Sequence, residues 1–343
     1  MQPEQAPALA RWLAGRLGAH DAVTDVTPLS TGFSAETVSF RFGDRRLILR
    51  LESPDPAVYP QQAPGHDVEV DIQYRVMAAL AAGTSIPLAG LIGFEASPAV
   101  LGTPFFVMEY VDGDVPLVAP TYASAGFFAD APPAQRAQMI EDGLRRLAEI
   151  HTIDWEKQDL GWLLPPGEEP SALRQLRIWR SYTERELAGR RFDLLERAFG
   201  WLEEHAPPHH PADVTLNWGD PRIGNMIWRD HRCVCVTDFE AASIAPYLVD
   251  LGWWLMFDRW SHEHSGAPRL DGEPTREEQA ALYFACSGRP PTDTHWYEVF
   301  AAARYCAIVV RVINRTVDRG LMPADNDYWR DNQATACLQD LLP

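Results

Sequence analysis

The sequence has few of the features that mark secreted, membrane-spanning or metal-stapled proteins. It contains five cysteines in 343 residues, without the paired spacing of a zinc site. Residues 1–4 lack a basic and apolar leader, and no apolar run reaches the roughly 20 residues that a membrane span requires. With unpaired cysteines and no leader or membrane span, we expect a protein of the reducing cytoplasm and no membrane partner.

Positive charge is also scarce. There are 30 Lys and Arg against 48 Asp and Glu, a formal net charge of −18 at pH 7. Such an acidic chain repels a phosphate backbone, which argues against nucleic acid as a partner. The charge is scattered along the chain, so it is compatible with a cationic substrate but does not require one. With 46% hydrophobic residues, the chain can bury a sizeable core, most simply as two lobes around a cleft.

The most informative pattern lies in residues 217–225, which read Asn-Trp-Gly-Asp-Pro-Arg-Ile-Gly-Asn. Phosphoryl transfer from ATP needs a carboxylate to orient the attacking hydroxyl and oxygen ligands to hold Mg²⁺ against the phosphates. Asp220, Asn225 and Asp238 supply these groups. Residues 232–237 predict a buried strand after a turn, so the two metal ligands would flank one hairpin. The alternative is an ordinary polar turn, but the combination of loop, hairpin and second Asp favours a kinase centre.

This pattern resembles the aminoglycoside phosphotransferase family, which includes choline kinase-like proteins. The family's loop commonly reads His-Gly-Asp-x-x-x-x-Asn, and its second metal site lies in a Val-x-Asp-Trp/Phe-Glu segment. The resemblance implies that Asp220 is the catalytic base, that Asn225 and Asp238 are metal ligands, and that ATP and Mg²⁺ are used. It also implies that Asp250 starts a helix and supports the loop. Trp218 stands where the family has His, and because indole cannot accept a hydrogen bond we expect the loop to lose an orienting group.

A nucleotide-binding half is expected upstream. A small-residue turn between two β-like stretches is suited to placing backbone N–H groups over phosphates, and it consists of Ser30, Thr31, Gly32, Phe33 and Ser34. In the strand predicted at 45–51, Ile48 and Arg50 share one face, which in kinase-like folds looks into the cleft. Ile48 would cover the adenine. Arg50 would bind phosphate where most family members use Lys, although an Arg on an edge strand can equally be a surface residue.

The helix predicted at 67–82 should carry a partner for Arg50. Glu69 and Gln73 lie one turn apart on the same side, and we expect Glu69 to be the ion partner and Gln73 to be the hydrogen-bonding alternative. Residues 101–111 predict a buried strand that ends in a connector between lobes. There, backbone groups of Glu109 and Val111 would bind the adenine edge and Met108 would close the back of its pocket.

A helix predicted at 298–319 places three arginines along one face. Arg304, Arg311 and Arg315 could receive an anionic part of the substrate, such as a carboxylate or a coenzyme A phosphate, or form salt bridges within the lobe. Candidate acceptor contacts are therefore Arg304 and Arg311, together with Arg222 and Glu240 beside the motif. The arginine face and the Trp-Gly-Asp variant look similar to the family branch related to the kinase domains of acyl-CoA dehydrogenase proteins, which phosphorylate hydroxyacyl thioesters.

We therefore expect a protein-kinase-like α+β fold with a β-rich lobe at 1–110 and a mainly helical lobe at 111–343. The expected reaction is O-phosphorylation of a small molecule, with either a hydroxyacyl thioester or an aminoglycoside-like compound as acceptor. A catalytically impaired nucleotide-binding protein is the alternative, if Arg50 and Trp218 have disabled turnover. A protein substrate is disfavoured because residues 238–250 leave no room for a long peptide-docking segment.

Overall fold

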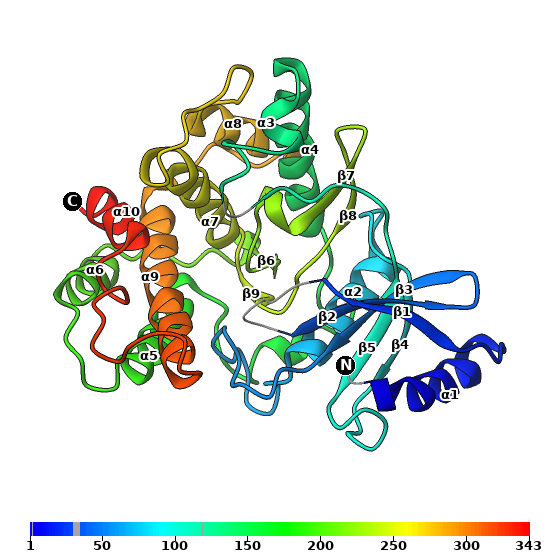
Figure 1. The fold of residues 1–343 in the computed structure, drawn as a ribbon. Coiled ribbons are helices and arrows are strands. Elements are labelled where there is room, and N and C mark those ends of the chain that lie inside the picture. The colour runs from blue at the N-terminus through cyan, green and yellow to red at the C-terminus, as the bar shows by residue number, and fades with distance from the viewer. Residues whose placement is uncertain (2, 30–34, 118–119) are drawn as a thin grey trace.

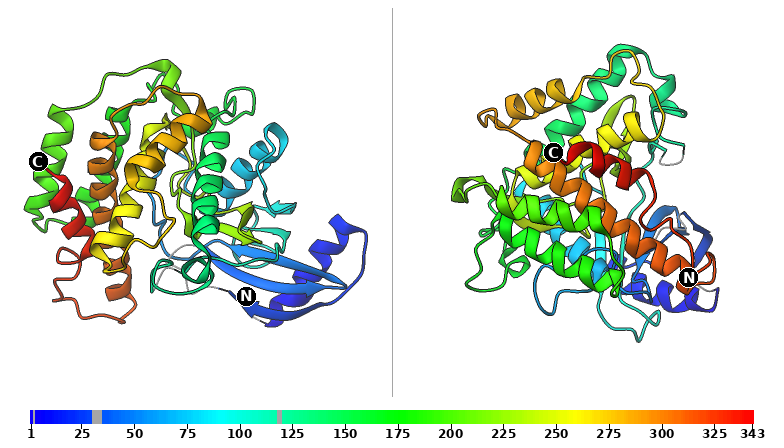
Figure 2. Two further views of the ribbon diagram at one scale, coloured as in Figure 1. Left: turned by 90° about the horizontal axis from the view of Figure 1, so that it is seen from above. Right: turned by 90° about the vertical axis from the view of Figure 1, so that its left-hand side faces the viewer.

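The computed structural model describes residues 1, 3–29, 35–117 and 120–343. Its N-terminal part is an antiparallel sheet with the strand order β1-β2-β3-β5-β4. The strands are Val23–Pro28 (β1), Glu36–Phe42 (β2), Arg45–Leu51 (β3), Leu91–Glu95 (β4) and Phe105–Glu109 (β5). The sheet and the flanking helix α1 (Ala6–Leu17) lie at one end of the molecule, and the helical remainder lies at the other (Figures 1 and 2). The predicted turn at Ser30–Ser34 falls outside the described residues.

The two faces of the sheet bury different partners. Leu47, Leu49 and Leu51 of β3 are buried in one cluster with Trp12 of α1. Because side chains alternate along a strand, Arg50 points to the opposite face, where it reaches the C-terminal part of the chain. The predicted separation of β3 into a core face and a cleft face is confirmed.

Residues 52–68 connect β3 to helix α2 (Glu69–Gly83), and we call this segment the strap. The Glu52 carboxylate accepts the backbone N–H groups of Glu69 and Val70 at 3.2 and 2.9 Å, which satisfies two donors at the start of α2. The Glu69 carboxylate in turn accepts the Val58 N–H at 2.9 Å. The first turn of α2 therefore holds both ends of residues 52–58 of the strap against this helix.

The C-terminal part is mainly helical. Its helices are α3 (Phe127–Asp130), α4 (Pro133–Ile150), α5 (Ala172–Leu187), α6 (Asp193–Glu204), α7 (Leu248–Arg259), a π-helical turn (Trp260–His264), α8 (Arg276–Ser287), α9 (His295–Asp318) and α10 (Gln333–Leu341). Two small antiparallel ladders lie among them and carry the loop singled out in the sequence. They pair β6 (Val214–Asn217) with β9 (Ser243–Pro246), and β7 (Met226–Arg229) with β8 (Arg232–Val236). The predicted hairpin is thus present, and Asp230 and His231 form its turn with positive φ angles of 49° and 60°.

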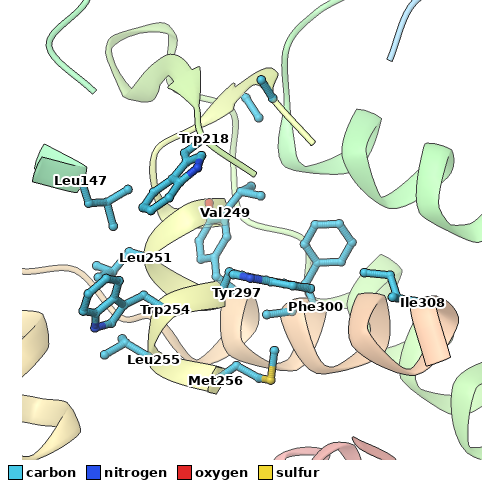
Figure 3. Packing of buried hydrophobic residues seen from close by; sticks show 14 of the residues in the cluster. Leu147, Trp218, Val249, Leu251, Trp254, Leu255, Met256, Tyr297, Phe300 and Ile308 are labelled. Atoms are coloured by element: carbon cyan, nitrogen blue, oxygen red, sulfur yellow. The ribbon is translucent and has the colours of Figure 1, made fainter. Parts of the chain in front are cut away.

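Helices α7 and α9 pack closely in the centre of this part. In Figure 3, Tyr297 and Phe300 of α9 lie beside the helix that carries Leu251 and Trp254. Gly252 permits this approach, because a Cβ atom there would lie 2.6 Å from backbone atoms of Tyr297. The absence of a side chain at one position therefore sets the distance between the two helices.

The expected α+β class, with a sheet-rich N-terminal part and a helical C-terminal part, is confirmed. The boundary between lobes at residue 110 stays a prediction. Across residues 1, 3–29, 35–117 and 120–343, no helix is both long and apolar enough to cross a membrane.

We predict that Gly252→Ala destabilises the protein by about 2–4 kcal/mol, because the added methyl group overlaps the α9 backbone. The matched control is Gly200→Ala in α6, where nothing lies within 4 Å of the added methyl group. There we expect stabilisation of about 0.5–1 kcal/mol from the better helix propensity of Ala. Urea unfolding of both variants measures the difference. Equal stabilities would show that α7 and α9 can separate without cost.

We also predict a pH dependence of stability from Glu69. Burial raises the pKa of this carboxyl to about 7, the Val58 N–H lowers it, and the Glu52 carboxylate raises it. Because the folded state holds this proton more tightly, the stability it contributes is present below about pH 4.5 and is lost as pH rises through about 7. Glu69→Gln keeps an acceptor for Val58 but cannot titrate.

Between about pH 5 and about pH 8, the wild type should therefore lose up to about 3 kcal/mol more unfolding free energy than Glu69→Gln. Urea unfolding across this pH range measures both proteins. Parallel pH profiles would rule out the assigned titration of Glu69.

Candidate active site

The loop after β6 is held by the first turn of α7. The buried Asp250 carboxylate accepts the backbone N–H groups of Trp218 and Gly219 at 2.6 and 3.0 Å. Gly219 has a φ of +93°, and a Cβ atom there would lie 2.1 Å from the Ala241 carbonyl oxygen. Only glycine fits this turn. The expectation that Asp250 supports the loop is confirmed.

Asp220 is held in place by several donors. It is 4% exposed, and its Oδ1 accepts the Trp253 indole N–H at 2.7 Å. Its Oδ2 accepts the Asn225 amide at 2.7 Å and the Tyr59 hydroxyl at 3.3 Å. Arg222 Nε lies 3.1 Å from Oδ2. The carboxylate is thereby fixed at the edge of the cleft.

The contacts of Trp253 and Tyr59 with Asp220 were not predicted from the sequence. Trp253 lies three residues after Asp250, and this helical spacing places both on the side of α7 that faces the loop. This spacing could have been used to predict the Trp253 contact from the sequence. Tyr59 comes from the strap, far from Asp220 along the chain, and no local pattern indicates the contact.

Arg222 is an ionised residue of this site. Burial acts to lower the pKa of its guanidinium, but the charges of Asp220 and Asp238 outweigh burial and raise it. Arg222 also lies over the Phe257 ring, 5.7 Å from its centroid. A permanent positive charge therefore sits beside the predicted base.

Asp238 follows β8 with a φ of +66°, a conformation that few residues other than glycine adopt. The indole N–H of Trp218 donates to the carbonyls of Thr237 and Asp238 at 2.8 and 3.0 Å. The expectation that Trp218 removes an orienting group is wrong. The indole only donates, but the acceptors beside it are backbone carbonyls, so a donor is what this position uses.

Arg50 links the sheet to the loop. Its Nη2 lies 3.4 Å from Asp238 Oδ1 and 3.5 Å from Glu240 Oε2, and its Nη1 donates to Thr37 at 3.0 Å. The expected pairing with Glu69 or Gln73 is wrong. Glu69 turns toward the strap to accept the Val58 N–H. Gln73 donates to Glu240 at 2.8 Å and so reaches Arg50 only through that carboxylate.

The chain has a single lysine, Lys157. Its side chain is 80% exposed and pairs with Asp154 in the helical part of the chain. No lysine is therefore available to bind a phosphate from β3. Arg50 occupies the position where most family members have that lysine. Arg50 contacts Asp238, and Arg222 contacts Asp220, so arginines supply the positive charge next to these carboxylates.

The donor set suits a hard divalent cation. Burial is the largest cause that raises the pKa of the Tyr59 hydroxyl, and the charges of Asp220, Glu240 and Asp238 raise it further. Three carboxylates therefore converge on one region. Asn225 adds an amide oxygen in the same loop. Magnesium is typically held by one or two carboxylates together with substrate phosphates. In the part of the chain that the structure covers, no group of three or more His, Cys, Asp or Glu is arranged to hold a metal alone.

The predicted adenine site lies at the end of β5. Met108 is opposite Ile48 in the β3–β5 register, which places both at one level of the sheet. The Glu109 N–H donates to the Gly90 carbonyl at 2.8 Å and is therefore used within the protein. This leaves the Glu109 carbonyl and the backbone groups of Val111 for the predicted adenine contacts.

The arginines of α9 contact the protein itself. Arg304 is 3% exposed, donates to the Gly219 carbonyl at 3.0 Å and lies between Trp179 and Trp253, and burial lowers its pKa to about 10. Arg311 contacts Glu186 at 3.3 Å and the Pro56 carbonyl at 2.8 Å. Of the two interpretations of this arginine face, the structure fits the intramolecular one.

A cavity of about 490 Å³ opens beside the loop. Asp220, Arg222, Asp238 and Glu240 line its polar end. The rest is mainly aromatic and aliphatic, with Trp253, Trp254, Phe257, Trp260, Tyr305, Ile308, Val309 and Val312. A small molecule in this cavity would place one group at Asp220 and bury apolar atoms against α7 and α9.

Comparison with known proteins agrees with this geometry. Acyl-CoA dehydrogenase family member 10 from Mus musculus is 26% identical over 325 residues, which are 90% of this chain and 28% of the mouse protein. The chain thus spans less than a third of that relative, and the similarity bears out the resemblance to the acyl-CoA dehydrogenase-associated branch.

Solved structures share the fold. A candidate aminoglycoside phosphotransferase from Ralstonia eutropha has a TM-score of 0.74 at 23% identity, covering 98% of this chain and 95% of that one. Macrolide 2′-phosphotransferase MphH from Brachybacterium faecium has a TM-score of 0.58 at 18% identity, covering 98% of both chains. The sequence model of the phosphotransferase enzyme family matches residues 25–284, about three quarters of the chain. The chain belongs to the phosphotransferase enzyme family.

Proposed function

We propose that the protein transfers the γ-phosphoryl group of ATP, with Mg²⁺, to a hydroxyl of an acyl-type small molecule such as a hydroxyacyl thioester. The observation that carries the proposal is the cavity, which joins Asp220 to an apolar pocket between α7 and α9. Pockets of this size and lining hold small molecules through apolar contact, with a few polar groups fixing orientation. The similarity to an acyl-CoA dehydrogenase family member supports the same acceptor class.

The charges of the cavity argue against a polycationic aminoglycoside. Each carboxylate that lines it already has an arginine partner. Arg222 pairs with Asp220, Arg50 with Asp238 and Glu240, and Arg269 with Asp258. An ammonium group would have to compete with these guanidinium groups, and burying it against tryptophans without a counter-charge is costly. An uncharged acyl chain meets neither obstacle.

In the proposed mechanism, Asp220 orients the acceptor hydroxyl and accepts its proton as the oxygen attacks phosphorus. The Trp253 indole holds Oδ1, which directs Oδ2 toward the acceptor. Arg222 is charged and lies beside Asp220, so it offsets negative charge that develops on the phosphoryl oxygens. Tight positioning of the carboxylate by α7 lowers the cost of reaching the reactive geometry.

Asn225 and Asp238 would hold Mg²⁺, which when bound neutralises charge on the nucleotide phosphates. Arg50, tied to Asp238 and Glu240 in this structure, would bind phosphate from the sheet side. Ile48 and Met108 would pack on the adenine, with the Glu109 carbonyl and the Val111 N–H at its edge. We divide the protein accordingly into a nucleotide-binding lobe at 1–110 and an acceptor-binding lobe at 111–343, and we expect it to work in the cytoplasm.

We predict that Asp220→Asn lowers kcat by about 10²–10⁴-fold while keeping the thermal shift caused by Mg²⁺-ATP. The amide keeps the shape of the side chain but cannot take the proton. Asp220→Ala should behave in the same way, with some loss of stability because Trp253 loses its acceptor. Steady-state kinetics and thermal melting measure the two effects. Full activity of either variant would refute the assignment of Asp220 as base.

The acceptor is tested by ATP consumption against a panel of hydroxyacyl-CoA thioesters and a panel of aminoglycosides. We expect turnover with the thioesters only, because of the apolar lining of the cavity. Turnover with aminoglycosides alone would contradict the proposed acceptor. A Mg²⁺-ATP melting shift without turnover on either panel would instead support the catalytically impaired alternative.

A further inference from the structure

The strap, residues 52–68, crosses from the sheet to the helices of the other lobe. Arg311 and Arg315 of α9 both donate to the Pro56 carbonyl, Arg311 at 2.8 Å, and Arg319 pairs with Asp55. The arginine face that the sequence singled out thus fastens one side of the strap. These contacts hold Asp55 and Pro56 of the strap against α9.

The other side of the strap is fastened to α5. The Tyr182 hydroxyl donates to the Val58 carbonyl at 2.6 Å. Gln175 donates to the Gln62 side chain at 2.9 Å. Tyr59 lies between these two attachments, so its backbone position is fixed from both sides.

Tyr59 places its hydroxyl on the predicted base. The hydroxyl donates to Asp220 Oδ2 at 3.3 Å, and the side chain lines the cavity. Burial and then the charges of Asp220, Glu240 and Asp238 raise the pKa of this hydroxyl well above its ordinary value, so it stays protonated and remains a donor. An acceptor hydroxyl must donate to the same carboxylate in order to react.

We propose that Tyr59 is a positioning residue that covers Asp220 until the acceptor hydroxyl replaces it, and so keeps water from serving as the acceptor. The inference rests on the proposed phosphotransferase function. Without Tyr59, water bound to Asp220 would attack the γ-phosphorus, its proton would pass to the carboxylate, and the bond to ADP would break. The products would be ADP and inorganic phosphate. The strap would thereby couple the use of ATP to the presence of the acceptor.

The direct test is Tyr59→Phe, which removes one hydroxyl and keeps the ring. We expect hydrolysis of Mg²⁺-ATP without acceptor to rise by about 5-fold or more, and the acceptor KM to fall, because the acceptor no longer displaces a hydrogen bond. The matched control is Tyr74→Phe in α2, whose ring stacks on Phe94 away from the base. It should change neither quantity. Unchanged hydrolysis and acceptor KM in Tyr59→Phe would overturn the inference.

A second measurement does not depend on activity. Amide hydrogen exchange of residues 55–62, without nucleotide, should be faster in Tyr59→Phe and in Arg319→Ala than in the wild type and Tyr74→Phe. Both changes remove an attachment of the strap, and Arg319 lies at its exposed edge. If exchange is faster in these variants but the wild type does not consume ATP with any acceptor, the attachment of the strap by Tyr59 and Arg319 would be supported and the proposed function refuted. Unchanged exchange in Tyr59→Phe would overturn the inference even if the wild type transfers phosphate.

Discussion

The acceptance of two backbone N–H groups by one buried carboxylate determines the geometry of this site. Asp250 lies in the first turn of α7 and holds Trp218 and Gly219, which fixes the turn that presents Asp220. The same helix supplies Trp253, whose indole fixes Oδ1 of that Asp220. Since α7 also lines the apolar cavity, one helix sets the loop backbone, the direction of the base and a wall of the proposed acceptor pocket. A displacement of α7 would therefore disturb all three.

The relation between the sheet and the helices depends on a second set of contacts. Arg50 reaches from β3 to Asp238 and Glu240, and the strap reaches from β3 to α5 and α9. Arg50 lies on β3, and the strap starts where β3 ends. The packing of β3 against α1 therefore fixes the position from which both reach the helices. The chain relies on arginine for these bridges, because its one lysine is exposed elsewhere. The planar guanidinium group suits this purpose, since it can contact two carboxylates or a carboxylate and a carbonyl at once.

The sequence was sufficient for the parts of the site that are contiguous or periodic. Asp220, Asn225 and Asp238 lie on one loop and one hairpin, and the alternation of β3 revealed which face holds Arg50. Contacts between distant segments could not be predicted, because their geometry is set by packing. Tyr59 reaches Asp220 through the path of the strap, Glu69 turns away from Arg50 to bind the Val58 N–H, and the cavity forms only where several helices meet.

The most direct test of this account is the turnover of Asp250→Asn. Trp218 and Gly219 donate to different oxygens of the carboxylate, so an asparagine, with one oxygen and one NH₂ group in their places, leaves one of the two N–H groups without an acceptor. We expect kcat to fall by about 10²-fold, because the base is displaced, while the Mg²⁺-ATP melting shift persists. An Asp250→Asn variant that turns over at the wild-type rate would show that the loop keeps its geometry without this carboxylate, and would contradict the account.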